Sequence, residues 1–159
     1  MQKITPFLWF DNNAEEAMNF YASVFKDSKI GKVTRYPDDF PGRGGTVLTG
    51  TIQIEGQEFV VLNGGPQFKF TEAISFVVNC ENQEEVDYYW NKLTADGGSE
   101  GDCSWLKDKF GLSWQIVPTI LFKLLGDPDR AKAKRAMDAM MKMKKIDIET
   151  LKRAAQESK

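Results

Sequence analysis

The segment Cys103-Ser-Trp-Leu-Lys-Asp-Lys-Phe-Gly-Leu-Ser-Trp-Gln-Ile-Val-Pro118 has the pattern of a strand, a tight turn and a second strand. Cys103–Lys107 is short and rich in apolar residues, and Asp108–Gly111 supplies a turn that ends in glycine, a residue that tolerates positive φ. Leu112–Val117 is the second predicted strand. Gln115 lies in the middle of that strand, where a polar side chain is expected to face a cavity or a partner.

A strand followed by a helix occurs twice in the chain, at an offset of 69 residues. The first pair is predicted for Ile4–Phe10 and Ala14–Phe25, and the second for Ala73–Asn79 and Gln83–Thr94. Further strands of the first half are predicted at residues 29–36, 46–54 and 58–63. An internal repeat of this kind constrains the architecture strongly. The alternative is a chance likeness between two strand–helix units.

Each half therefore reads as strand–helix–strand–strand–strand. This order predicts an α+β fold in which two βαβββ modules form a cup-shaped mixed sheet, followed by a C-terminal helical extension. We expect residues 1–125 to form one domain with modules at about 1–70 and 71–125, and residues 126–159 to form the extension.

The extension has its own composition. Helices are predicted for Thr119–Leu125, for Arg130–Met143 with Pro128 in its first turn, and for a segment capped by Asp147. Residues sharing one face of the middle helix are Ala136, Met137, Met140 and Met141. A Met stripe at helical spacing is typical of packing surface, so we interpret the extension as a brace at a subunit interface.

Charge and composition limit the possible functions. The net charge is −2, which favours neither nucleic acid nor membrane as a partner, although residues 126–159 alone carry +4. No apolar run reaches the length of a membrane span, and no signal peptide is recognisable. Two cysteines do not form a disulfide framework, so a cytoplasmic location is expected. The chain has 0 histidines, which removes His-based acid–base catalysis and every His-ligated metal site.

Four segments resemble a known family. They are Asn13–Ala17 before Phe20-Tyr21, Leu62–Pro66, Phe76–Cys80 and Trp105–Pro118. Together with the extension they are similar to the PhnB-like, 3-demethylubiquinone-9 3-methyltransferase-like branch of the vicinal oxygen chelate (glyoxalase/bleomycin resistance/dioxygenase) superfamily. The resemblance implies paired βαβββ modules, often in a homodimer, with a cup that in metal-using members holds a divalent ion on His and Glu ligands.

The ligand positions of such metal-using members can be carried over without gaps. They fall near Pro6 and Ser75 on the first strand of each module, on Gln115 in the second module, and on Val61 or Leu62 in the first. None of these side chains is a carboxylate or an imidazole, which divalent ions need for tight binding. We therefore predict no standard divalent metal and no other cofactor.

Aligning this sequence with metal-using members in the same way also suggests which side chains line the cup. The candidates are Gln115, Ser75, Asn63, Trp105, Cys103 and Phe10. Strand alternation puts Phe10 on the face of Pro6, and Cys103 on the face of Trp105. Gln115 is either a ligand-orienting amide or a structural one. Trp105 either stacks on a planar ligand or packs in the core, and Cys103 is either a nucleophile or a buried neutral thiol.

These residues predict a protein that binds a small molecule in the cup without a standard His/Glu metal site, as a homodimer. One alternative is an enzyme of the same superfamily (lyase, isomerase, dioxygenase or methyltransferase-like) with a non-standard site. Another is an interaction module that acts through the basic helical tail. Whether the two modules pair within the chain or across a dimer stays open.

Overall fold

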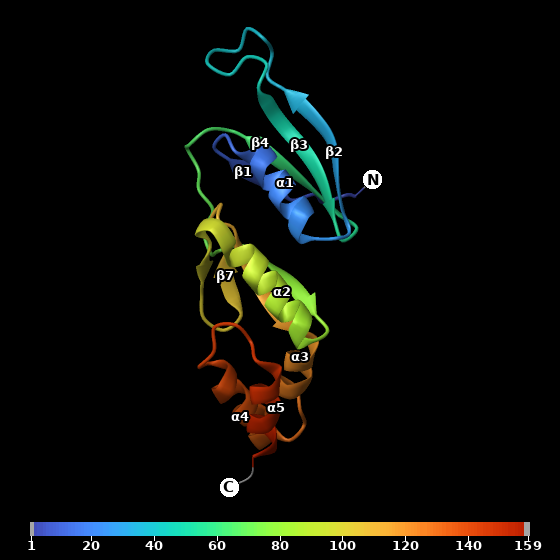
Figure 1. Cartoon of the computed structure of the whole chain (residues 1–159), viewed down its shortest axis with the longest axis vertical. Coiled ribbons are helices and arrows are strands. Elements are labelled where there is room, and N and C mark those ends of the chain that lie inside the picture. Colours follow the sequence, from blue (N-terminus) through green and yellow to red (C-terminus); the bar gives the residue numbers. More distant parts are fainter. Residues whose placement is uncertain (1, 158–159) are drawn as a thin grey trace. The chain divides into compact units, whose positions relative to one another are not determined.

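The computed structural model describes residues 2–157. Contacts divide the chain into two compact units, Met1–Phe70 and Thr71–Lys159. Each unit contains a four-stranded mixed sheet with a helix on one face, as the repeat predicts (Figure 1). The α+β fold with two βαβββ modules and C-terminal helices is thus confirmed.

The first unit is a single βαβββ module. Its elements are β1 Phe7–Phe10, α1 Ala14–Val24, β2 Ser28–Arg35, β3 Val47–Ile54 and β4 Gln57–Asn63. The strand order is β1-β4-β3-β2, in which β1 runs parallel to β4 and the other neighbours are antiparallel. Helix α1 contacts β2, β3 and β4 and so covers one face of this sheet.

The second unit repeats the module and adds three helices. Its elements are β5 Ser75–Cys80, α2 Gln83–Thr94, β6 Ser99–Glu100, β7 Trp105–Lys107, β8 Ser113–Pro118, α3 Thr119–Leu125, α4 Arg130–Met140 and α5 Ile148–Gln156. The strand order β5-β8-β7-β6 matches that of the first unit, again with one parallel pair, β5 and β8.

The two modules differ by one residue between the first strand and the helix. Three residues link β1 to α1, but only two link β5 to α2. The helices therefore correspond at the predicted offset of 69, whereas the strands correspond at 70, so that Phe10 matches Cys80. Because side chains alternate along a strand, this one-residue difference reverses the face assigned to β1.

Asp108 organises the β7–β8 hairpin. Its carboxylate is only 2% exposed and accepts three hydrogen bonds. Oδ1 accepts from the backbone N–H groups of Phe110 (2.9 Å) and Leu112 (3.1 Å), and Oδ2 accepts from Trp114 Nε1 (2.9 Å). A buried carboxylate needs such donors to be stable, so the turn, the second strand and one core indole are fixed together.

The first strand of this hairpin is shorter than the sequence predicts. Cys103 and Ser104 have φ values of 54° and 80°, which lie outside the strand region, and β7 begins at Trp105. Their N–H groups instead donate to the carbonyls of Met143 and Lys144, both at 2.9 Å. The prediction of a strand from Cys103 was therefore wrong, because the extension supplies the hydrogen-bond acceptors at this point.

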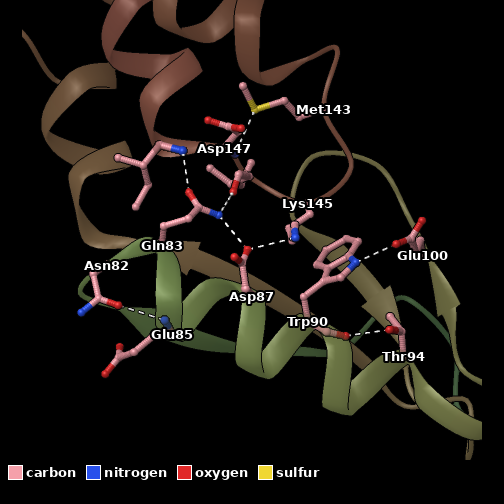
Figure 2. A network of polar contacts seen from close by, with 12 residues as sticks. Asn82, Gln83, Glu85, Asp87, Trp90, Thr94, Glu100, Met143, Lys145 and Asp147 are labelled. Carbon is pink, nitrogen blue, oxygen red and sulfur yellow. Dashed lines mark hydrogen bonds and ion pairs between the residues drawn. The ribbon is translucent and has the colours of Figure 1, made fainter.

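The extension packs on the second unit, through an apolar cluster and a polar clamp. The cluster consists of Val117, Leu121, Ile146 and Leu151. In the clamp, Gln83 Nε2 donates to the Ile146 carbonyl (3.0 Å), and Gln83 Oε1 accepts from Ile148 N–H (2.8 Å), as Figure 2 shows. The extension is therefore a brace for its own unit, while a role at a subunit interface stays a prediction.

Asp87 extends the same network (Figure 2). Its Oδ1 accepts from Gln83 Nε2 and pairs with Lys145 Nζ, both at 2.9 Å. The hydrogen bond from Gln83, helped by Lys145, holds the pKa of the Asp87 carboxyl below its usual range. The start of α2 is thus tied to the segment that precedes α5.

Helix α4 differs from its prediction in two ways. Asp129 is its N-cap, accepting hydrogen bonds from Ala131 and Lys132 N–H, so Pro128 precedes the cap and is not in the first turn. The helix also ends at Met140. Its buried face contains Ala133 and Ala136, whereas two members of the predicted stripe are exposed, Met137 by 41% and Met141 by 62%.

We expect Asp108→Asn to destabilise the second unit by about 2–4 kcal/mol, because the amide cannot accept all three hydrogen bonds. Urea unfolding followed by tryptophan fluorescence measures this. The exposed Asp96, which has φ 56°, gives the matched control Asp96→Asn, and Asn tolerates that conformation. Equal stability of the two variants would contradict the assigned role of Asp108.

Replacing Gln83 by Ala should destabilise the packing of the extension by about 1–3 kcal/mol, because a backbone carbonyl and an N–H group lose their partners. Thermal unfolding and amide hydrogen exchange at Ile148 report the loss. The same change at the exposed Gln156 of α5 controls for composition. Unchanged protection at Ile148 would show that the apolar cluster alone holds the extension.

Candidate functional site

The sheet of the second unit has one face turned away from α2. Trp114 and Ile116 point to the helix side and are 4% and 0% exposed, respectively. Gln115, between them, is half-buried and therefore points to the opposite face. We call this opposite face of β5, β7 and β8 the Gln115 face.

Strand register places two rows of side chains on the Gln115 face. The first row consists of Trp105, Gln115 and Val77, and the second of Lys107, Ser113 and Ser75. Three of the predicted site residues, Gln115, Ser75 and Trp105, thus share this face. Whether they bind a ligand stays a prediction.

Gln115 and Ser75 are in direct contact. Gln115 Nε2 donates to Ser75 Oγ at 2.8 Å, across the parallel pair of β8 and β5. Gln115 Oε1 accepts no hydrogen bond from residues 2–157. One end of the amide is therefore oriented by the protein, while the other end is available to a bound molecule.

Trp105 lies beside Gln115 on β7 and is half-buried. Its Nε1–H has no acceptor within the described part of the chain, in contrast to Trp90 Nε1, which donates to Glu100 Oε1 at 2.8 Å. An indole with a free N–H and a partly exposed ring provides both a flat apolar surface and a donor.

The second row contains two residues that were not among the predicted site residues, Lys107 and Ser113. Lys107 forms an ion pair with Glu72, and its hydrogen bond to that carboxylate holds the pKa of Glu72 below its usual range. Ser113 is 0% exposed. Strand alternation puts Ser113 on the face of Gln115 and Lys107 on the face of Trp105, so this signal was present in the sequence.

Asn63 has a structural role. Its Oδ1 accepts from Ala14 N–H at 2.9 Å, and its Nδ2 donates to the Val47 carbonyl at 3.1 Å. The first of these bonds satisfies a free N–H at the start of α1, where Asn13 makes no side-chain cap. Asn63 is 7% exposed and lies on the helix side of its sheet, so it does not line the opposite face.

The Asn63 carbonyl also anchors a loop of the first unit. It accepts hydrogen bonds from Tyr36 Oη at 2.6 Å and Arg43 Nη1 at 3.1 Å. The Arg43 guanidinium also lies 5.6 Å from the centre of the Tyr36 ring. These contacts hold residues 37–45 against the end of β4.

Phe10 and Cys103 are also placed differently from the prediction. Phe10 is 3% exposed and pairs in register with Asn63, so it faces α1. Cys103 precedes β7 and does not share a face with Trp105. Its thiol contacts the Met140 carbonyl at 3.6 Å. Phe10 lies on the helix side because the link from β1 to α1 is one residue longer than the corresponding link in the second module. Cys103 lies outside the strand because its φ is positive.

The other cysteine is not suited to nucleophilic chemistry. Cys80 is 0% exposed, and burial, with a contribution from Glu85, raises the pKa of its thiol to about 12. The thiolate is the reactive form, so Cys80 is an inert core residue near neutral pH.

The Gln115 face does not offer the donors that a divalent cation requires. At Gln115 and Ser75, two positions to which the resemblance assigns metal ligands, this unit has a neutral amide and a hydroxyl that are bonded to each other. A divalent ion needs carboxylates or imidazoles to compensate its charge. Since the chain has 0 histidines, the residues present do not fit a standard metal site.

The order and pairing of the strands define a class, the α+β proteins that contain two βαβββ modules. A model of the 3-demethylubiquinone-9 3-methyltransferase family matches residues 2–117. The chain therefore belongs to this family, which confirms the resemblance noted from the sequence. The match ends at Val117, within β8 and before α3 begins at Thr119.

Solved structures of other proteins have a similar fold. The PhnB protein from Bacillus cereus is 42% identical over 74% of this chain and 100% of its own, with a TM-score of 0.67. A protein from Pseudomonas aeruginosa shares the fold at 17% identity and TM-score 0.60, over 74% of this chain and 98% of its own. The fosfomycin resistance protein FosX from Listeria monocytogenes, complexed with Mn(II) and sulfate, shares the fold at 13% identity and TM-score 0.54, over 79% and 97%.

A search of curated proteins found no match. Within residues 2–157, no helix is long and apolar enough to span a membrane.

Proposed function

We propose that this protein binds a small molecule on the Gln115 face, without a resident divalent metal. The observation that carries the proposal is the Gln115–Ser75 hydrogen bond beside Trp105. It fixes one end of an amide, while the other end and the neighbouring indole N–H have no partner among residues 2–157. Polar groups with spare capacity beside an aromatic surface are typical of small-molecule sites.

The family's name mentions methyl transfer, which we do not extend to this chain. Dinucleotide-type α/β sites lie at the carboxyl ends of parallel strands, beside a glycine-rich turn. Here each sheet has one parallel pair only, and Asp11–Asn13 follow β1 in place of such a turn. Binding of a small molecule is the function that these residues support directly.

Gln115→Ala should weaken binding of small molecules by roughly three- to tenfold, because one oriented hydrogen bond is lost. A fragment library is screened by NMR against the isotope-labelled full chain, and hits are titrated against the variant. Asn91, exposed on α2, gives the control Asn91→Ala. Hits that shift neither the Gln115 amide nor the Trp105 indole would contradict the proposed site.

Chain purified from medium rich in zinc and manganese should contain less than about 0.1 equivalent of divalent metal, because its donors are neutral. Elemental analysis by mass spectrometry measures this. Gln115→Glu should raise the bound metal, since it adds a carboxylate at a position to which the resemblance assigns a metal ligand. Stoichiometric, tightly bound metal in the unaltered chain would refute the metal-free proposal.

A further inference from the structure

A cavity of about 270 Å³ adjoins the Gln115 face of the second unit. Its lining includes Trp105, Lys107 and Ser113 from the two rows, with Ser99 of β6 and Glu72 before β5. Its volume is just below that of sites for drug-sized ligands, so it suits a small compound. The cavity lies wholly within one compact unit.

Ser113 belongs to the lining of this cavity and carries a buried hydroxyl. The residue is 0% exposed, and its Oγ has no hydrogen-bond partner within residues 2–157. Buried polar groups are nearly always paired, so an exception in a cavity wall indicates a missing partner. A hydroxyl can donate one hydrogen bond and accept others, so it suits a carboxylate oxygen or a water.

Lys107 brings a positive charge to the same wall. Its Nζ pairs with the carboxylate of Glu72, and the two side chains are 44% and 59% exposed. Exposed ion pairs of this kind are weak and exchange readily with other ions. The second acidic residue in the lining, Glu100, is already engaged by Trp90 Nε1 at 2.8 Å. Glu72 is therefore the carboxylate that an incoming anion would replace.

We propose that this cavity takes a small aromatic or apolar carboxylate, whose anionic group displaces Glu72 from Lys107 and accepts a hydrogen bond from Ser113 Oγ. The apolar part of the ligand lies against the Trp105 ring. Glu72 acts as an internal competitor that occupies Lys107 until the ligand arrives. This inference rests on the proposed function, because it names the class of ligand that the Gln115 face binds.

The test compares benzoate with benzamide, its neutral analogue of the same shape, by NMR titration of the full chain. Benzoate should bind about tenfold more tightly, because only the carboxylate gains the charged partner. Lys107→Gln should abolish that preference. Lys123→Gln, the same charge change at an exposed position of α3, should preserve it.

Glu72→Gln is the most decisive variant. Because it removes the competing carboxylate, it should tighten benzoate binding roughly three- to tenfold and leave benzamide binding unchanged. The exposed Glu149 of α5 gives the control Glu149→Gln. Ser113→Ala should weaken benzoate binding without lowering the urea midpoint, because the lost hydroxyl has no hydrogen-bond partner within residues 2–157. Circular dichroism verifies that each variant folds.

Several outcomes would overturn the inference: equal affinity for benzoate and benzamide, no benzoate binding, weaker benzoate binding in Glu72→Gln, or equal effects of Lys107→Gln and Lys123→Gln. A marked loss of stability in Ser113→Ala would also overturn it, since it would reveal a structural partner for the hydroxyl. If neutral fragments still bind in a Gln115-dependent way, the proposed function stands and only the carboxylate assignment fails.

Discussion

The arrangement of the second unit depends on one buried carboxylate. Asp108 accepts hydrogen bonds from two backbone N–H groups of the hairpin turn and from the indole of Trp114. Since an uncompensated buried carboxylate is very costly, these donors must come together for the unit to fold. Once Trp114 is fixed on the helix side, strand alternation forces Gln115 and Ser113 to the other face. The residue that closes the hairpin therefore also determines which side chains can meet a ligand.

The sequence predicted most of the architecture because its signals are periodic. Apolar spacing located both βαβββ modules and the three C-terminal helices; α2 and α3 have the predicted limits, and Asp147 caps α5 as predicted. The faces of the strands were harder to predict, because a shift of one residue moves every side chain of a strand to the opposite face. The one extra residue between β1 and α1 reverses the face assigned to Phe10, and Asn63, its register partner on β4, lies on the same helix side.

The remaining errors have a different physical origin, namely tertiary hydrogen bonds that no local pattern encodes. Cys103 and Ser104 leave the strand conformation because carbonyls some 40 residues later in the chain accept their N–H groups. Asn13 makes no side-chain cap at α1, and Asn63 from the last strand of the module supplies the acceptor instead. Sequence propensity gives the expected local conformation, and distant partners override it when they satisfy the same backbone groups better.

The polar groups of this protein also differ in how completely they are satisfied. Asp108, Asn63 and Gln83 each make two or more hydrogen bonds, and each ties together segments that the fold must hold. On the Gln115 face the pattern is reversed, because half of an amide, an indole N–H and a buried hydroxyl lack partners among residues 2–157. Native sequences tolerate such unsatisfied groups mainly where function requires them. The same face carries Lys107, whose carboxylate partner is largely exposed and weakly held. The indole N–H and the hydroxyl can donate, whereas the remaining end of the Gln115 amide, Oε1, only accepts. A ligand with an anionic acceptor would therefore pair with the two donors and with Lys107, but not with Oε1.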